Sequence, residues 1–300
     1  MRKSLCKLIE DTIIFEYSLP NAEKGIERVH FSTNDDDCFS VANKESLVSI
    51  IYNSILDYSF QEFDLNKESY KNLLVKAFRT KFKYNANASE ESKLRLGFYG
   101  EVLLHSLLNK LYGTNCLICR GHFYNPLNNN ETTGYDCYHL IENINEQKIE
   151  LWFGEVKFYI NPESAVKKVM ENIDKALSDK YLETNLIAML EHKDKITNDK
   201  SILKKIIEKW EENPEIIISD ELKNNNISLV YPIFVIYDLN KALYDDSIKN
   251  IVEYIKNNHN ISPSLSINYK LFFIFMPIQN VKEVKEEVLK WIEEKKPVLS

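Results

Sequence analysis

Two opposite charges lie inside a run of residues that is otherwise apolar. Glu155 and Lys157 interrupt residues 151–159, which have the length and the aromatic content of a β-strand. Because side chains alternate between the two faces of a strand, both charges point to one face and Val156 points to the other. Burying charges among aromatic side chains is costly unless they are paired or bind a metal. The fold must therefore bring a compensating group to this strand.

A third charged residue, Asp136, begins the preceding expected strand. If the two strands pair through the short connection at 143–147, Asp136 lies beside Glu155, and adjacent carboxylates repel unless a cation lies between them. Mg²⁺, or alternatively Mn²⁺, would bind their oxygens and leave positions for water and phosphate. Lys157 would then stabilise negative charge that develops near the metal. This group of residues predicts phosphodiester hydrolysis.

The Glu-x-Lys triplet carries little information by itself, because it recurs along the chain, for example at Glu91 and Glu283. Only the triplet at Glu155 lies in an apolar strand with an Asp at the head of the strand before it. The alternative is a salt bridge between Glu155 and Lys157 without a metal, in which case replacing either residue would lower stability and not chemistry.

Hydrophobic periodicity predicts a mixed α/β protein with a mixed central sheet between helices. The expected strands are 13–17 and 26–31, which would form a hairpin, then 116–120, 135–141, 148–159, 228–239 and 267–278. The expected helices are 45–58, 67–78, 89–113, 161–181, 202–210, 246–257 and 281–294. Glu101 lies on the helix 89–113.

Three short motifs occur in a fixed order, namely Gly100-Glu101 on a helix, then Gly134-Tyr135-Asp136, then Glu155-Val156-Lys157. They resemble the PD-(D/E)xK nuclease superfamily, although Tyr135 stands where the superfamily name has Pro. More narrowly, the chain resembles HamA, the family of nuclease subunits of Hachiman antiphage defence systems, and a related abortive-infection family. The resemblance covers about residues 90–295 as an order of elements.

The resemblance implies a restriction-endonuclease-like core at 87–300, with a polar helical insertion at about 194–226, preceded by an N-terminal hairpin and helical cap at 1–86. It implies that Asp136 and Glu155 are metal ligands and that the Val156 carbonyl completes the shell. Lys157 would assist the attacking water, and Glu101 would be a helix-borne acid that also binds the metal. The alternative for Glu101 is a solvent-exposed residue in the middle of a helix.

The net charge of −7 opposes unaided DNA binding, because proteins that grip DNA usually present a positive surface to the phosphates. Either a local basic patch or a partner must supply the affinity. The segment 78–84 interleaves basic and aromatic residues, and Lys93, Arg95 and Arg120 are further candidates for DNA contact. A solvated basic turn is the alternative for this segment.

The sequence contains no Gly-rich phosphate loop of the Walker type, so a nucleotide-driven motor would have to be a partner. The resemblance implies that this partner is a superfamily 2 helicase. The leading hypothesis is a Mg²⁺-dependent deoxyribonuclease that works with a helicase in bacterial antiphage defence. The alternatives are a type II-like restriction endonuclease and a catalytically silent adaptor that keeps the nuclease fold.

Two further groups of residues receive no functional role from the sequence. Cys116 and Cys119, with His122, Cys137 and His139 nearby, have zinc-like spacing, but in a strand the two thiols of the pair would face opposite sides, so they are expected to be core thiols. The acidic run 34–37 is expected to be solvated.

The sequence also indicates the compartment. The cysteine number is odd, the start of the chain is charged, and no run approaches the roughly 18 apolar residues of a membrane span. We therefore expect a cytoplasmic protein with reduced thiols and no membrane partner.

Overall fold

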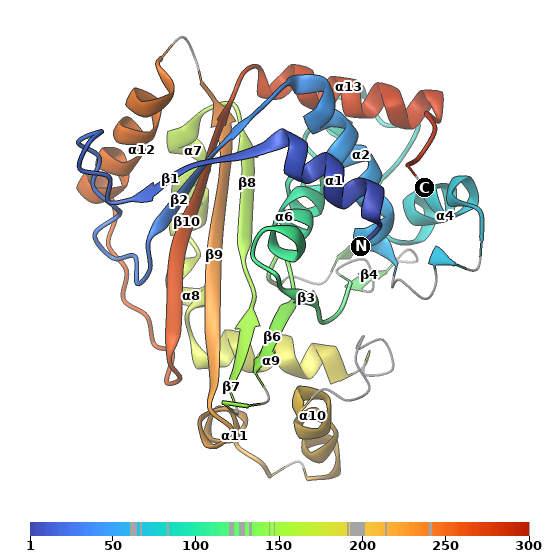
Figure 1. Ribbon diagram of the computed structural model, residues 1–300. Helices are drawn as coiled ribbons and strands as arrows, with labels where there is room; N and C mark the ends of the chain where they lie inside the picture. The colour runs from blue at the N-terminus through green and yellow to red at the C-terminus, as the bar shows by residue number, and fades with distance from the viewer. Residues whose placement is uncertain are drawn as a thin grey trace.

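The sheet at the centre of the molecule is mixed and carries helices on both faces (Figure 1). The computed structural model describes residues 1–60, 65–66, 68–82, 84–119, 123–125, 130–131, 134–143, 145–146, 148–190, 192, 202–213, 215–239 and 242–299. Within them, an eight-stranded sheet has the order β1-β2-β10-β9-β7-β6-β3, and β8 also pairs with β9. The mixed α/β architecture expected from the sequence is confirmed.

The strands of this sheet are β1 (Ile13–Leu19), β2 (Asp36–Val41), β3 (Asn115–Cys116), β6 (His139–Asn143), β7 (Lys148–Trp152), β8 (Glu155–Tyr159), β9 (Ile227–Asp238) and β10 (Tyr269–Ile278). A separate two-stranded sheet consists of β4 (Tyr124–Asn125) and β5 (Asn130–Glu131). The helices are α1 (Lys3–Thr12), α2 (Lys44–Ser59), α4 (Tyr70–Thr80), α5 (Glu90–Leu94), α6 (Phe98–Lys110), α7 (Pro162–Met170), α8 (Ile173–Ala176), α9 (Asp179–Leu190), α10 (Ile202–Glu212), α11 (Ile218–Asn224), α12 (Tyr244–Asn258) and α13 (Val281–Glu294).

Two apolar cores lie on opposite faces of the sheet. One packs against α1, α2, α4, α6 and α13, and the other against α7 to α12 (Figure 1). The central strand β9 contributes side chains to both cores, because Tyr231 and Ile233 belong to one core while Val230 and Phe234 belong to the other. Burial on both faces explains why β9 and β10 are continuous apolar runs in the sequence.

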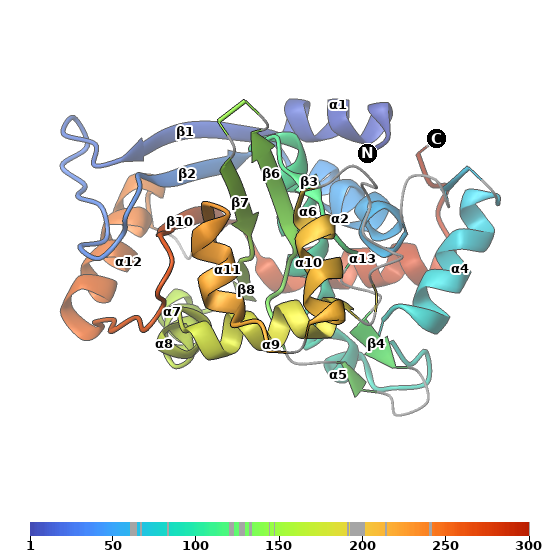
Figure 2. The ribbon, with the colours of Figure 1, turned by 90° about the horizontal axis from the view of Figure 1, so that it is seen from below.

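Several expected elements are confirmed, among them α2, α12, α13, β9 and β10, whose ends differ from the predicted ones by at most two residues. Helices α10 and α11 occupy the polar insertion and pack against α9 at one end of the sheet (Figure 2). Residues 194–201 and 214 of that insertion lie outside the described residues. None of the helices in the described part of the chain is both long and apolar enough to cross a membrane.

Near the N-terminus, the partner of β1 is β2 and not the expected strand 26–31, of which only Ile26 forms an isolated bridge. Helix α1 was not predicted. The acidic run begins β2, where Asp36 is fully buried and accepts hydrogen bonds from the amides of Val29 and Phe273. Burial raises the pKa of Asp36 to about 7, so the expectation of a solvated run is wrong for this residue. The boundary expected between residues 86 and 87 stays a prediction, although β2 pairs with β10 in the same sheet.

Other expected elements are shorter than predicted or broken. The helix 89–113 is divided into α5 and α6 around Gly97, and the helix 161–181 continues as α7, α8 and α9. The strand expected at 116–120 ends at Cys116, and the strand expected at 135–141 begins only at His139. Side-chain periodicity does not reveal such breaks, because they depend on contacts with distant parts of the chain.

The expected strand 148–159 is interrupted between β7 and β8. Trp152 pairs with Val230 and Glu155 pairs with Ile233, so the register is kept across the break and Pro232 lies opposite Gly154. Pro232 has no amide hydrogen to donate to the ladder. A Cβ atom on Gly154 would lie 2.6 Å from the Pro232 carbonyl oxygen and 2.8 Å from its Cγ. Only glycine fits there without displacing β9.

The Gly154→Ala variant is therefore expected to lose about 1–3 kcal/mol of unfolding free energy, because the methyl group meets backbone and ring atoms that cannot rotate away. Urea unfolding measures the loss. Gly97→Ala is the matched control, since the atom nearest to its added Cβ is the carboxylate oxygen of the flexible Glu101 side chain. Equal losses in the two variants would show that the contact with Pro232 is not tight.

Candidate active site

Asp136 bridges the break between β7 and β8. Its amide donates a hydrogen bond to the Gly154 carbonyl at 2.9 Å, and its Oδ2 accepts one from the Val156 amide at 2.9 Å. The sequence placed Asp136 at the head of a strand, but it lies three residues before β6. Its proximity to the Glu-x-Lys strand is nevertheless as predicted.

The Lys157 ammonium lies among oxygens of this cluster. It forms an ion pair with Glu155, donates to the Val156 carbonyl at 3.1 Å and lies 3.9 Å from Asp136 Oδ2. Burial disfavours the charge on Lys157, but the carboxylates of Asp136 and Glu155 outweigh it and raise the lysine pKa above its usual range. The three residues expected to act together are in one cluster, and their side chains are only 16–20% exposed.

Glu101 reaches the same place from the first turn of α6. Gly100 lets the helix approach β8 closely, because a Cβ atom there would lie 2.9 Å from Val156 Cγ2. The hydroxyl of Tyr58 donates to Glu101 Oε2 at 2.5 Å. Glu101 is thus held beside the cluster, and the alternative of an exposed mid-helix residue does not describe its position.

A cavity of about 750 Å³ opens beside β8. Glu101, Asp136, Val156 and Lys157 line it, whereas Glu155 is not among the lining residues and contacts Lys157. In the described residues, β8 pairs with β9 alone, so its other edge is not covered by a strand. The cavity therefore meets the sheet at an open strand edge.

The oxygen donors around the cavity fit a hard divalent cation. The carboxylates of Asp136 and Glu101 line the cavity. Val156 lines it too, and its backbone carbonyl would be the third oxygen donor. The Glu155–Lys157 ion pair is also present, which is the contact that the metal-free salt-bridge interpretation requires. Metal binding and replacement of Lys157 distinguish the two interpretations.

Three basic residues line the cavity in addition to Lys157, namely Arg95, Lys282 and Lys285. The Lys285 ammonium donates to the Phe158 carbonyl at 2.8 Å, and burial lowers its pKa to about 8. The sequence pointed to Arg95 but not to Lys285, because nothing in the sequence distinguishes this lysine from others on α13.

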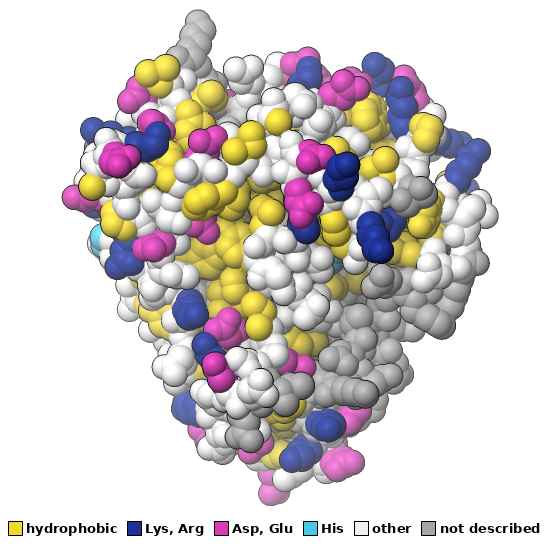
Figure 3. Space-filling view, in the orientation of Figure 1, with side chains coloured by type: hydrophobic (Ala, Val, Ile, Leu, Met, Phe, Trp, Pro, Cys, Tyr) yellow, Lys and Arg dark blue, Asp and Glu magenta, His cyan; other side chains and the backbone are white. Residues whose placement is uncertain are grey.

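The expected basic and aromatic surface is only partly present. Phe82 is buried and stacks on Tyr58, and Lys93 forms an ion pair with Glu293. Lys83 and Arg120 lie outside the described residues. On the described face seen in Figure 3, acidic and basic side chains are interspersed, so no broad positive surface covers it. The cavity is the better candidate for local phosphate contact.

Comparison with known proteins identifies one family. A family model described as HamA matches residues 7–292. The matched region includes the N-terminal strands and α2 as well as the candidate site. No curated protein matches the chain.

Mg²⁺ is expected to raise the melting temperature of the protein, because a ligand that binds only the folded state stabilises it, by about 2.7 kcal/mol at a hundredfold excess over Kd. Asp136→Asn should abolish the shift, which differential scanning fluorimetry measures. Glu163→Gln on the exposed start of α7 is the control and should retain it. An unchanged shift in Asp136→Asn would exclude Asp136 as a ligand.

Proposed function

Because the chain belongs to the HamA family, we propose that it is a metal-dependent deoxyribonuclease and the effector of a Hachiman antiphage defence system. The observation that carries this proposal is the Lys157 ammonium between Asp136 and Glu155 at an open strand edge, beside a cavity that Glu101 also lines. The order α6, β6, β7, β8 supports our proposal that the site has a PD-(D/E)xK core.

Asp136, Glu101 and the Val156 carbonyl would hold Mg²⁺ or Mn²⁺ from the cavity side, with Glu155 as a further ligand. The bound ion supplies Lewis-acid polarisation of the phosphate and lowers the pKa of a bound water. Lys157 stabilises the negative charge that develops on the phosphate, because the surrounding oxygens favour its charged form. Its hydrogen bond to the Val156 carbonyl also orients it towards the cavity.

The remaining basic residues of the cavity would bind the phosphates that flank the cleaved bond. Arg95, Lys282 and Lys285 provide positive charge on a protein whose net charge is −7. So few contacts give weak affinity for DNA by themselves. We therefore propose that a partner brings the DNA to this site, and that this partner is a superfamily 2 helicase.

The test measures cleavage of single- and double-stranded DNA and of RNA by the purified chain, with Mg²⁺ or Mn²⁺, alone and with the proposed helicase partner. Glu155→Gln and Lys157→Met are each expected to lower the cleavage rate about 100-fold or more, since the first removes a charged metal ligand and the second removes the positive charge that acts on the reacting phosphate. Gel-resolved initial rates and melting temperatures are compared for every variant.

A second lysine and glutamate pair provides matched controls. Lys148 and Glu150 form an ion pair at 2.7 Å with the same two-residue spacing on β7, and neither residue lines the cavity. Glu150→Gln and Lys148→Met should keep the wild-type cleavage rate. Sequence-specific cleavage by the isolated chain would favour a restriction endonuclease. An adaptor would be favoured by a different result, in which wild type cleaves no substrate and replacing Lys157 lowers only the stability of the protein.

A further inference from the structure

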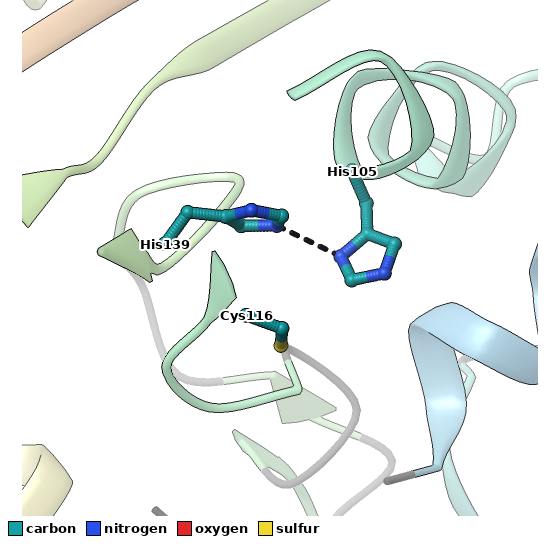
Figure 4. Close-up of side chains that lie close together, drawn as sticks. All are labelled: His105, Cys116 and His139. Carbon is teal, nitrogen blue, oxygen red and sulfur yellow. Dashed lines mark hydrogen bonds between the residues drawn. The ribbon is translucent and has the colours of Figure 1, made fainter. Parts of the chain in front are cut away.

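A cluster of metal-binding side chains lies outside the candidate active site. His105 on α6, Cys116 at the end of β3 and His139 at the start of β6 point toward one another (Figure 4). One ligand atom from each lies within 4.8 Å of the other two. The two imidazoles are fully buried and their facing nitrogens, His139 Nε2 and His105 Nδ1, are 2.9 Å apart.

Cys119 is the candidate fourth donor, and it lies next to Cys116 because the strand expected there ends early. β3 ends at Cys116, and the chain bends before Cys119, so the two sulfur atoms lie 3.8 Å apart. The argument that these thiols face opposite sides of a strand is therefore wrong. Two thiolates bound to one tetrahedral zinc at about 2.3 Å are separated by about 3.8 Å. The sulfur spacing already has this value.

A further hydrogen bond fixes the orientation of the His139 ring. The Thr114 hydroxyl forms a hydrogen bond with His139 Nδ1 at 2.7 Å. Such a contact orients the ring and leaves Nε2 facing the cluster, as the outer partners of metal-binding histidines do.

The charges of this donor set match a buried divalent ion. Two neutral imidazoles and two thiolates on Zn²⁺ have no net charge, which suits a site among buried residues. Zinc binding would displace the thiol protons.

We propose that His105, Cys116, Cys119 and His139 form a buried structural zinc site. The ligand atoms of His105, Cys116 and His139 already lie close together. The thiol of Cys119 lies beside that of Cys116 and would complete the set by rotating toward the two imidazoles. Sulfur and imidazole donors select zinc, whereas the oxygen donors of the cavity select Mg²⁺ or Mn²⁺. The site would join α6 to the edge strand β3 and to its neighbour β6.

The test is the zinc content of the full-length protein, purified under reducing conditions and measured by inductively coupled plasma mass spectrometry. Wild type is expected to hold about one zinc per chain, and Cys116→Ser and His139→Ala to lose most of it. Cys38→Ser is the matched control, because Cys38 is a buried thiol on β2, near the opposite edge of the sheet. It should retain the metal.

A second readout does not depend on the variants folding. Wild-type protein stripped by a chelator and reloaded with Co²⁺ should show thiolate-to-metal charge-transfer absorption, and stripping should lower its melting temperature. Three results would overturn the proposal. They are wild type without zinc or cobalt after reconstitution, unchanged zinc in a folded Cys116→Ser protein, and a Cys116–Cys119 disulfide found by mass spectrometry of the purified protein.

Discussion

The absence of an amide hydrogen on Pro232 organises the strands around the candidate site. Pro232 lies in the central strand and faces Gly154, so the ladder between β9 and the segment beside it is interrupted there. Asp136 binds the backbone next to this interruption, since its amide donates to the Gly154 carbonyl and its carboxylate accepts from the Val156 amide. Among the residues that the structure describes, β8 pairs with β9 alone, so no strand covers its other edge.

The position of α6 follows from a second close approach. Gly100 rests on Val156, so the helix lies nearer to β8 than a residue with a Cβ atom would permit. Val156 points into the core below α6, and its strand neighbours Glu155 and Lys157 point to the other face. The apolar face of β8 therefore holds the helix that carries Glu101, while the polar face supplies the charges. Core packing and charge are divided between alternate side chains of one five-residue strand.

The sequence allowed prediction of features that depend on local pattern. The charged triplet in an apolar run, the buried strands β9 and β10 and the helix α13 all have strong periodicity, and all are found where expected. Features set by distant contacts were missed. The break at Gly154 depends on Pro232, the burial of Asp36 depends on the amides of Val29 and Phe273, and the place of Lys285 depends on where α13 packs. None of these contacts can be predicted from the residues adjacent to them in the sequence.

Tyr58 connects the cavity and the buried His105 cluster. Its hydroxyl donates to Glu101, and its ring meets the ring of His105 edge to face with centroids 5.8 Å apart. Glu101 and His105 are four residues apart, so they lie on one face of α6 in successive turns. Any shift of α6 would therefore move Glu101 in the cavity and His105 in the buried cluster together. The cluster with His139 restrains the helix on the sheet side, and Tyr58 restrains it on the side of α2. The placement of Glu101 in the cavity is thus a property of this whole assembly and not of its own contacts alone.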